Sequence, residues 1–154
     1  MNDKIFGLRE LDLALSELPK VTARAALRRT GLAALAPFVE KVRQLAPVDE
    51  DPASTPERRP GTLRDSYHAG TKLNKSQART ARREGKSFVE VYAGTNDPAG
   101  VQTEFGNSHQ AAQPHARTAW DATHDAVLNK VGSQLGVEID NAAQRLARKA
   151  ARNA

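Results

Sequence analysis

The sequence predicts an α+β fold in which a small antiparallel sheet packs against an N-terminal helix, a long proline-kinked helix and a long C-terminal helix. Three segments carry apolar residues at helical spacing, and two shorter segments between them have the pattern or composition of strands. A strongly basic segment separates these two strands. The length of 154 residues fits a single domain, 1–154, without internal repeats.

Apolar residues that recur every three or four positions predict the helices. Residues 2–18 carry a leucine-rich stripe that ends before Pro19, and residues 20–46 carry a second stripe. Pro37 lies inside the second stripe, where proline removes a backbone hydrogen bond and crowds the preceding turn. We therefore expect one long bent helix or two helices there. Residues 115–153 form the third and longest stripe, which contains Trp120, Val127, Val131, Leu135, Ile139, Ala142 and Leu146.

Two strands are predicted on either side of a basic arm. Residues 62–72 place Leu63 and Tyr67 on one face by alternation, and residues 87–95 are rich in aromatic and β-branched side chains. Residues 73–86 lack an apolar face, so we expect an extended hairpin arm there. Farther along, residues 101–105 suit a helical turn or a strand, and 106–114 form a polar loop.

Composition excludes some kinds of site and leaves the class of partner open. The chain has no cysteine, so it has no disulfides, thiolate zinc sites or cysteine nucleophile. It lacks a signal-peptide pattern and the roughly 18 consecutive apolar residues of a membrane span, so we expect no membrane association. The formal net charge of +5 is compatible with nucleic acid, an acidic partner or simple solubility.

No motif predicts catalysis, a metal or a cofactor. The four histidines (68, 109, 115 and 124) fall on separate predicted elements without a compact ligand spacing, and we expect scattered surface side chains. Nucleophile-elbow and phosphate-loop patterns do not occur. A proline-rich loop, 47–61, contains the acidic triplet Asp49, Glu50 and Asp51. A solvated loop, or a contact patch for a basic partner, fits this triplet better than a catalytic pair does.

The basic arm is the candidate docking element. It contains no aromatic residue, so base stacking is not indicated. Three interpretations stay open: a solvated loop, docking on an acidic protein surface, and contact with phosphates. Its cations, with the lysine that precedes it, are Lys72, Lys75, Arg79, Arg82, Arg83 and Lys86.

Several short patterns occur in the order typical of one protein family. The pair Ala46-Pro47 is followed by Gly61-Thr62-Leu63-Arg64-Asp65-Ser66, then Glu104-Phe105-Gly106, then Gln113-Pro114 before the last helix. This ordered set resembles the gene-product-ten-like tail-component family of lambda-like long-tailed phages, which also occurs in prophages and gene-transfer particles. The resemblance covers about residues 6–125. It departs from the family pattern at Asn107, usually threonine, at His115, usually aromatic, and in a longer 47–61 loop.

The resemblance implies a structural role at the junction of head and tail. Members are neck or tail-completion proteins, so it implies a virion protein without catalysis or cofactor, assembled in the bacterial host cytoplasm as a six- or twelve-fold homo-oligomeric ring. Its partners would be portal, adaptor or head-closure proteins on one side and a tail terminator or tail-tube protein on the other, with packaged DNA as a candidate transient contact. The family-signature residues are Leu63, Arg64, Ser66, Glu104, Phe105, Gly106, Gln113 and Pro114.

Structural roles are expected for these signature residues. We expect Phe105 to anchor its loop in the core, Gly106 to supply a turn with positive φ, and Arg64 to pair with Glu104. Two other functions stay open. One is head closure or tail termination in the same particle, which the sequence does not separate from the neck role. The other, from a different class, is a small basic nucleic-acid-binding protein.

Overall fold

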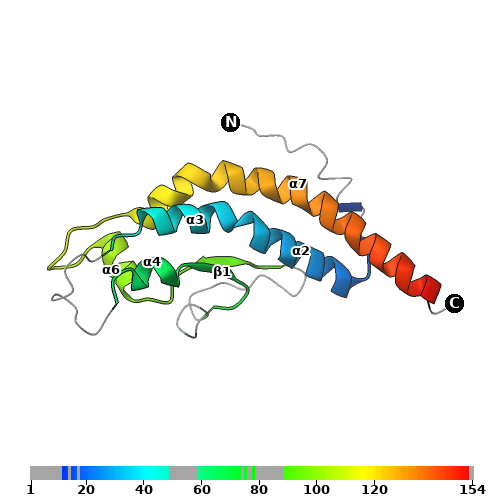
Figure 1. Ribbon diagram of the computed structural model, residues 1–154, viewed down its shortest axis with the longest axis horizontal. Coiled ribbons are helices and arrows are strands. Elements are labelled where there is room, and N and C mark those ends of the chain that lie inside the picture. The colour runs from blue at the N-terminus through cyan, green and yellow to red at the C-terminus, as the bar shows by residue number, and fades with distance from the viewer. Residues whose placement is uncertain are drawn as a thin grey trace.

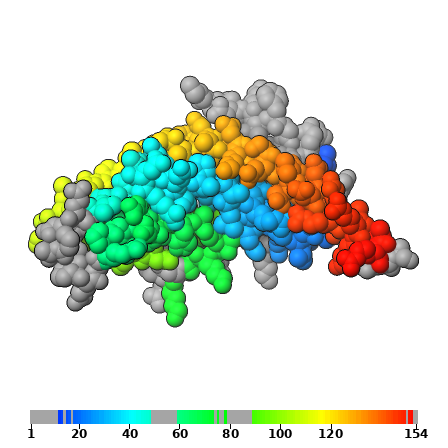
Figure 2. Space-filling model, in the orientation of Figure 1, coloured from blue at the N-terminus to red at the C-terminus, as the bar shows by residue number. Residues whose placement is uncertain are grey.

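The computed structural model describes residues 12–13, 15–16, 18–48, 59–73, 75, 78 and 89–152. It confirms the α+β class. The molecule is elongated, with one long helix along most of its length, two shorter helices beneath it, and a small sheet with two short helices below those (Figure 1; Figure 2). The predicted N-terminal helix, the 47–61 loop and the 73–86 arm lie largely outside the described residues, including Asp49–Asp51 and the arm cations Arg79, Arg82, Arg83 and Lys86.

The proline-interrupted stripe forms two helices, α2 (Lys20–Ala34) and α3 (Ala36–Leu45). Leu35 joins them, and Pro37 stands in the first turn of α3, where its missing N–H is tolerated. This confirms the two-helix alternative. The C-terminal stripe forms α7 (His115–Arg152), as predicted up to the last residue described in it.

The core lies where α2 and α3 pack along α7. Small side chains let these helices approach closely, since Ala26, Ala34 and Ala119 are almost completely buried. Phe38 packs edge-on against Trp120, with ring centroids 5.8 Å apart. Trp120 itself lies at the rim of the core, 45% exposed. The main buried cluster consists of Ala34, Phe38, Val42, Ala46, Leu63, Tyr67, Ala119 and Val127.

The predicted strand over 62–72 is wrong for its first half. That half is a short helix, α4 (Thr62–Ser66), which follows Gly61 in a left-handed conformation with φ 80°. Leu63 and Tyr67 are both buried because a four-residue step places them on one side of a helical turn. Asp65, which the alternation put on the same face, is exposed.

The sheet is smaller than the sequence predicted. Strand β1 (His68–Gly70) pairs antiparallel with β2 (Tyr92–Gly94), and Ala69 lies opposite Ala93. Of the predicted strand over 87–95, residues 92–94 are confirmed as β2, the described residues 89–91 and 95 lie outside it, and residues 87–88 are not described. Residues 101–105 belong to a helix, α6 (Ala99–Phe105), which decides between the two alternatives predicted for them.

Candidate functional site

The three signature segments meet at the N-terminus of α7. Helix α4 with the residue after it, the end of α6, and the stretch that leads into α7 gather at one end of the molecule (Figure 1). Three buried side chains, Tyr67, Glu104 and His115, connect them. We call this set the polar junction.

Glu104 caps α7. Its two carboxylate oxygens accept backbone hydrogen bonds from Ala116 (2.8 Å) and Arg117 (3.0 Å), in the first turn of the helix. These N–H groups have no partner inside a helix, and the positive end of the helix dipole favours an anion there. Burial by itself raises the pKa of Glu104. The two backbone hydrogen bonds and the nearby His115 outweigh it, so the pKa lies below its usual value.

His115 is held from both ring nitrogens. Its Nδ1 lies 2.9 Å from the Gln113 carbonyl oxygen and its Nε2 lies 2.7 Å from the Tyr67 hydroxyl. A carbonyl oxygen only accepts, so Nδ1 carries a proton, and in the neutral ring Nε2 then accepts from the tyrosine hydroxyl. Nδ1 is also 3.5 Å from Glu104. The expectation of scattered surface histidines is therefore wrong for His115, which is 4% exposed.

Tyr67 completes the junction from the α4 side. It is 3% exposed, and its ring stands edge-on to that of His115. Burial, with the carboxylates of Glu104 and Asp97, raises the pKa of Tyr67 to about 12, so the hydroxyl stays protonated as the donor to His115. Its backbone carbonyl accepts from the Arg43 guanidinium at 2.6 Å. Each polar side chain of the junction has a hydrogen-bond partner, and the cluster therefore links α4, α6 and α7.

The turn after α6 confirms the prediction for Gly106. Its φ is 75° and its ψ is 173°, a region that essentially only glycine occupies. The Asn107 carboxamide oxygen then accepts from the backbone N–H groups of His109 and Gln110. Asn107, where the family usually has threonine, thus closes the following turn with its own side chain. After this turn, the Gln113 N–H donates a hydrogen bond to the Thr103 carbonyl oxygen at 2.7 Å, which holds the chain against α6.

Phe105 does not anchor the loop, so that prediction is wrong. Its side chain is 65% exposed, as is that of Val101 one turn earlier. Gly100, Thr103 and Glu104 occupy the buried face of α6 and leave Val101 and Phe105 on the outer face. We call these two residues the α6 ridge. The guanidinium of Arg117 lies 5.8 Å from the centre of the Phe105 ring.

The predicted pair between Arg64 and Glu104 is also wrong. Arg64 contacts the neighbouring Asp65 at 3.0 Å, whereas both oxygens of Glu104 face α7. Ser66 has a structural role, because its hydroxyl bonds the Leu63 carbonyl and the Thr95 hydroxyl and so ties α4 to the segment after β2. Gln113 and Pro114 are exposed where the chain enters α7.

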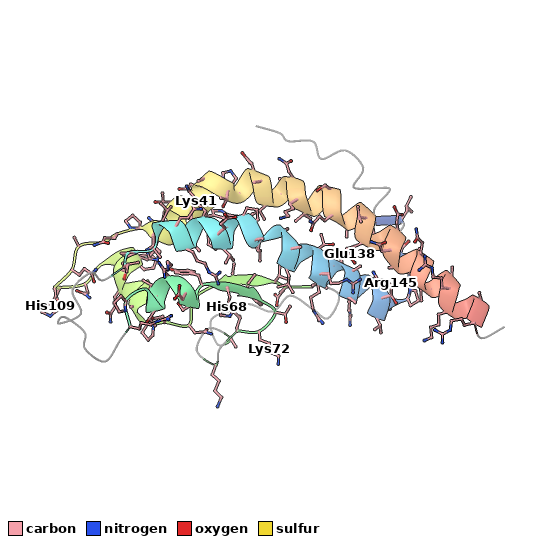
Figure 3. The ribbon with its side chains drawn as sticks, viewed as in Figure 1. Lys41, His68, Lys72, His109, Glu138 and Arg145 are labelled. Carbon is pink, nitrogen blue, oxygen red and sulfur yellow. The ribbon has the colours of Figure 1, made fainter. Side chains whose placement is uncertain are left out.

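A groove of about 460 Å³ lies beside the sheet. Phe38, Tyr92 and Trp120 contribute aromatic rings to its lining, which also includes His68 and Lys72. Figure 3 labels these last two residues. Lys72 and Lys75 are the two arm-region cations that the structure describes, and both are exposed. Within the described part of the chain, no three His, Asp or Glu side chains gather as metal ligands, and no helix is both long and apolar enough to cross a bilayer.

Replacing Tyr67 with phenylalanine tests the junction directly. Tyr67→Phe leaves Nε2 of His115 buried without a donor, so we expect the free energy of unfolding in urea to fall by about 1–3 kcal/mol. Tyr92→Phe is the control, because the Tyr92 hydroxyl bonds Glu90 at the surface. Equal losses in the two variants would contradict the assigned role of Tyr67.

No protein-family model, curated protein or solved structure matches this chain. The resemblance of its ordered motifs to a phage tail-component family therefore depends on the residues themselves and on how they are used in the fold.

Proposed function

We propose that this protein is a structural component of the head–tail junction of a tailed phage or phage-like particle, where it forms a ring that completes or joins head and tail. One observation carries the proposal. Three of the motifs behind the family resemblance are far apart in the sequence, yet they meet at the N-terminus of α7. Glu104 belongs to one of them, Tyr67 and His115 directly follow the other two, and these three side chains connect there. Motifs that share one structural purpose are better evidence for a family pattern than isolated short matches.

The small core supports assembly with other copies. Among the described residues, Val42 is the only large side chain that is less than 2% exposed. Five of the twelve buried hydrophobic residues in the described chain are alanines, which bury little apolar area each. Contacts with neighbouring subunits are therefore a suitable source of additional stability. The exposed α6 ridge offers apolar area for such a contact.

The sheet also suits a ring subunit. In the part of the chain that the structure describes, the sheet contains two strands that pair with each other. Each strand therefore has a second edge that no other described strand pairs with. Unpaired strand edges accept a segment from another chain. A contact between different surfaces of successive subunits closes into a ring when the rotation between them closes.

Purified particles provide the test. Quantitative mass spectrometry should find this chain in a fixed ratio to the portal protein that corresponds to one ring per particle. Disruption of its gene should give DNA-filled heads and separate tails by electron microscopy. Absence of the chain from finished particles, or normal joining without it, would rule the proposal out. Cryo-electron microscopy of the ring would separate a neck position from head closure or tail termination.

Complementation with α6 variants refines the test. Phe105→Asp should fold but fail to restore joined particles, because it places a charge in the proposed subunit contact. Gln102→Asp, at an exposed position on the same helix, should restore them. Successful complementation by both variants would show that the α6 ridge is not part of the ring contact.

A further inference from the structure

Positive charge is concentrated at one end of the molecule. Helices α2 and α7 run antiparallel, so the start of α2 and the end of α7 lie at the same end (Figure 1; Figure 2). Residues 20–34 and 134–152 together carry eight lysines and arginines against two carboxylates, Glu138 and Asp140. We call this region the basic end. Its cations are Lys20, Arg24, Arg28, Arg29, Arg145, Arg148, Lys149 and Arg152.

The rest of the described chain is electrically balanced. Outside the basic end, the described residues contain eight lysines and arginines and eight aspartates and glutamates. The part of the molecule that the structure describes therefore has a charge asymmetry along its length, and the field of these residues is positive at the basic end.

The cations of the basic end are exposed and only partly neutralised. Glu138 contacts Arg29 on α2 at 2.7 Å and Arg145 on α7 at 3.6 Å, which brings cations of the two helices beside one carboxylate (Figure 3). Within the residues described, no ion pair neutralises Arg28 on α2 or the final cations of α7, which are Arg148, Lys149 and Arg152.

The composition of the basic end indicates the kind of partner. Neither helical segment contains an aromatic residue, and the exposed large apolar side chains there are Val21 and Val137. Stable protein interfaces usually centre on buried aromatic anchors, whereas phosphate contacts need only cations and hydrogen-bond donors. Six of the eight cations are arginines, whose planar guanidinium groups bind phosphate in a bidentate manner.

We propose that the basic end binds the phosphate backbone of duplex DNA without sequence preference. The last four cations of α7 fall within eight residues, or about 12 Å of helix at 1.5 Å per residue. Duplex DNA carries about one negative charge per 1.7 Å of its axis, so several phosphates lie within reach. The proposal concerns α2 and α7, not the 73–86 arm, and it does not depend on the head–tail function.

Fluorescence anisotropy of the full chain with a labelled duplex, over a series of salt concentrations, tests the proposal. The triple variant Arg148→Gln/Lys149→Gln/Arg152→Gln should weaken binding more than about tenfold at physiological salt. It should also make the slope of log affinity against log salt shallower by about 0.9 for each phosphate that the variant no longer neutralises. A second variant, Arg24→Gln/Arg28→Gln, should show the same effects from α2.

The matched control is Lys75→Gln/Arg79→Gln/Arg82→Gln, which removes the same charge from the arm region and should bind DNA as the unmodified chain does. Circular dichroism melts check that all variants fold. Equally weakened binding in the arm and α7 variants, or weakened binding in the arm variant alone, would overturn the assignment to the basic end. Binding to polyglutamate as tight as to DNA would indicate an acidic protein partner instead. None of these outcomes changes whether the chain is found in particles, so the two proposals fail separately.

Discussion

Gly106→Ala is expected to lower the free energy of unfolding by about 2–4 kcal/mol. At φ 75° and ψ 173° an L-residue is strained, and an added Cβ would lie 2.8 Å from the Ala112 backbone nitrogen and 3.0 Å from the Gln110 carbonyl oxygen. Both neighbours are backbone atoms that cannot turn away as a side chain does. Because this turn leads from Glu104 back toward His115, the strain should also loosen the polar junction. Urea unfolding followed by circular dichroism measures the effect.

Gly132 provides the matched control. It lies in the interior of α7, and an added Cβ would meet nothing within 4 Å. Gly132→Ala should therefore raise stability by about 0.5–1 kcal/mol, because alanine loses less conformational entropy in a helix. If Gly106→Ala left stability unchanged or raised it, as Gly132→Ala should, Gly106 would not need its positive φ.

Glu104→Gln should destabilise the protein by about 2–4 kcal/mol at neutral pH. Glutamine offers one acceptor oxygen where the carboxylate serves both Ala116 and Arg117, and its amide group would face a backbone N–H. The substitution also removes the negative charge from the positive end of the α7 dipole. Glu40→Gln, at an exposed position on α3, is the control and should change stability by less than about 0.5 kcal/mol.

The effect of Glu104 should depend on pH. Its pKa is lower in the folded protein than in the unfolded chain, so its contribution is fully present above the unfolded pKa. The contribution is lost as pH falls through the lower folded value. The stability difference between the unmodified chain and Glu104→Gln should therefore shrink on acidification, whereas that for Glu40→Gln should stay small throughout. A difference that stayed constant into the acid range would contradict the capping role.

Long periodic segments made the helices predictable, and short segments were ambiguous. Residues 115–152 repeat their apolar pattern over many turns, which only a helix satisfies. In residues 62–67, one apolar pair four positions apart fits both a helical turn and alternation. The structure decides for the helix, because Leu63 and Tyr67 must reach the same core beside α3. A five-residue helix of this kind depends on tertiary packing more than on its own sequence.

The local chemistry of the site was predictable, and its pairings were not. The positive φ of Gly106 follows from turn chemistry that is contained in neighbouring residues. The roles of Phe105, Arg64 and His115 depend on which face of α6 turns inward. Hydrophobicity alone favoured Phe105 over Glu104 as the buried residue. Burial of Glu104 is acceptable because the N-terminus of α7 supplies its hydrogen bonds. One signal was available for His115: it occupies a position where the related pattern has an aromatic side chain, which is typical of a buried site.

The length of α7 has a mechanical consequence. The polar junction lies at the first residues of this helix and four of the basic-end cations lie in its last turns, so one continuous element of 38 residues sets the distance between them. At about 1.5 Å per residue this distance is about 57 Å along the helix. Helix α7 thus fixes the distance between its two ends, and the packing of α2 and α3 along it resists bending. Insertion or removal of a single residue in its middle would rotate one end by about 100° relative to the other, whereas a change of seven residues would nearly preserve the alignment.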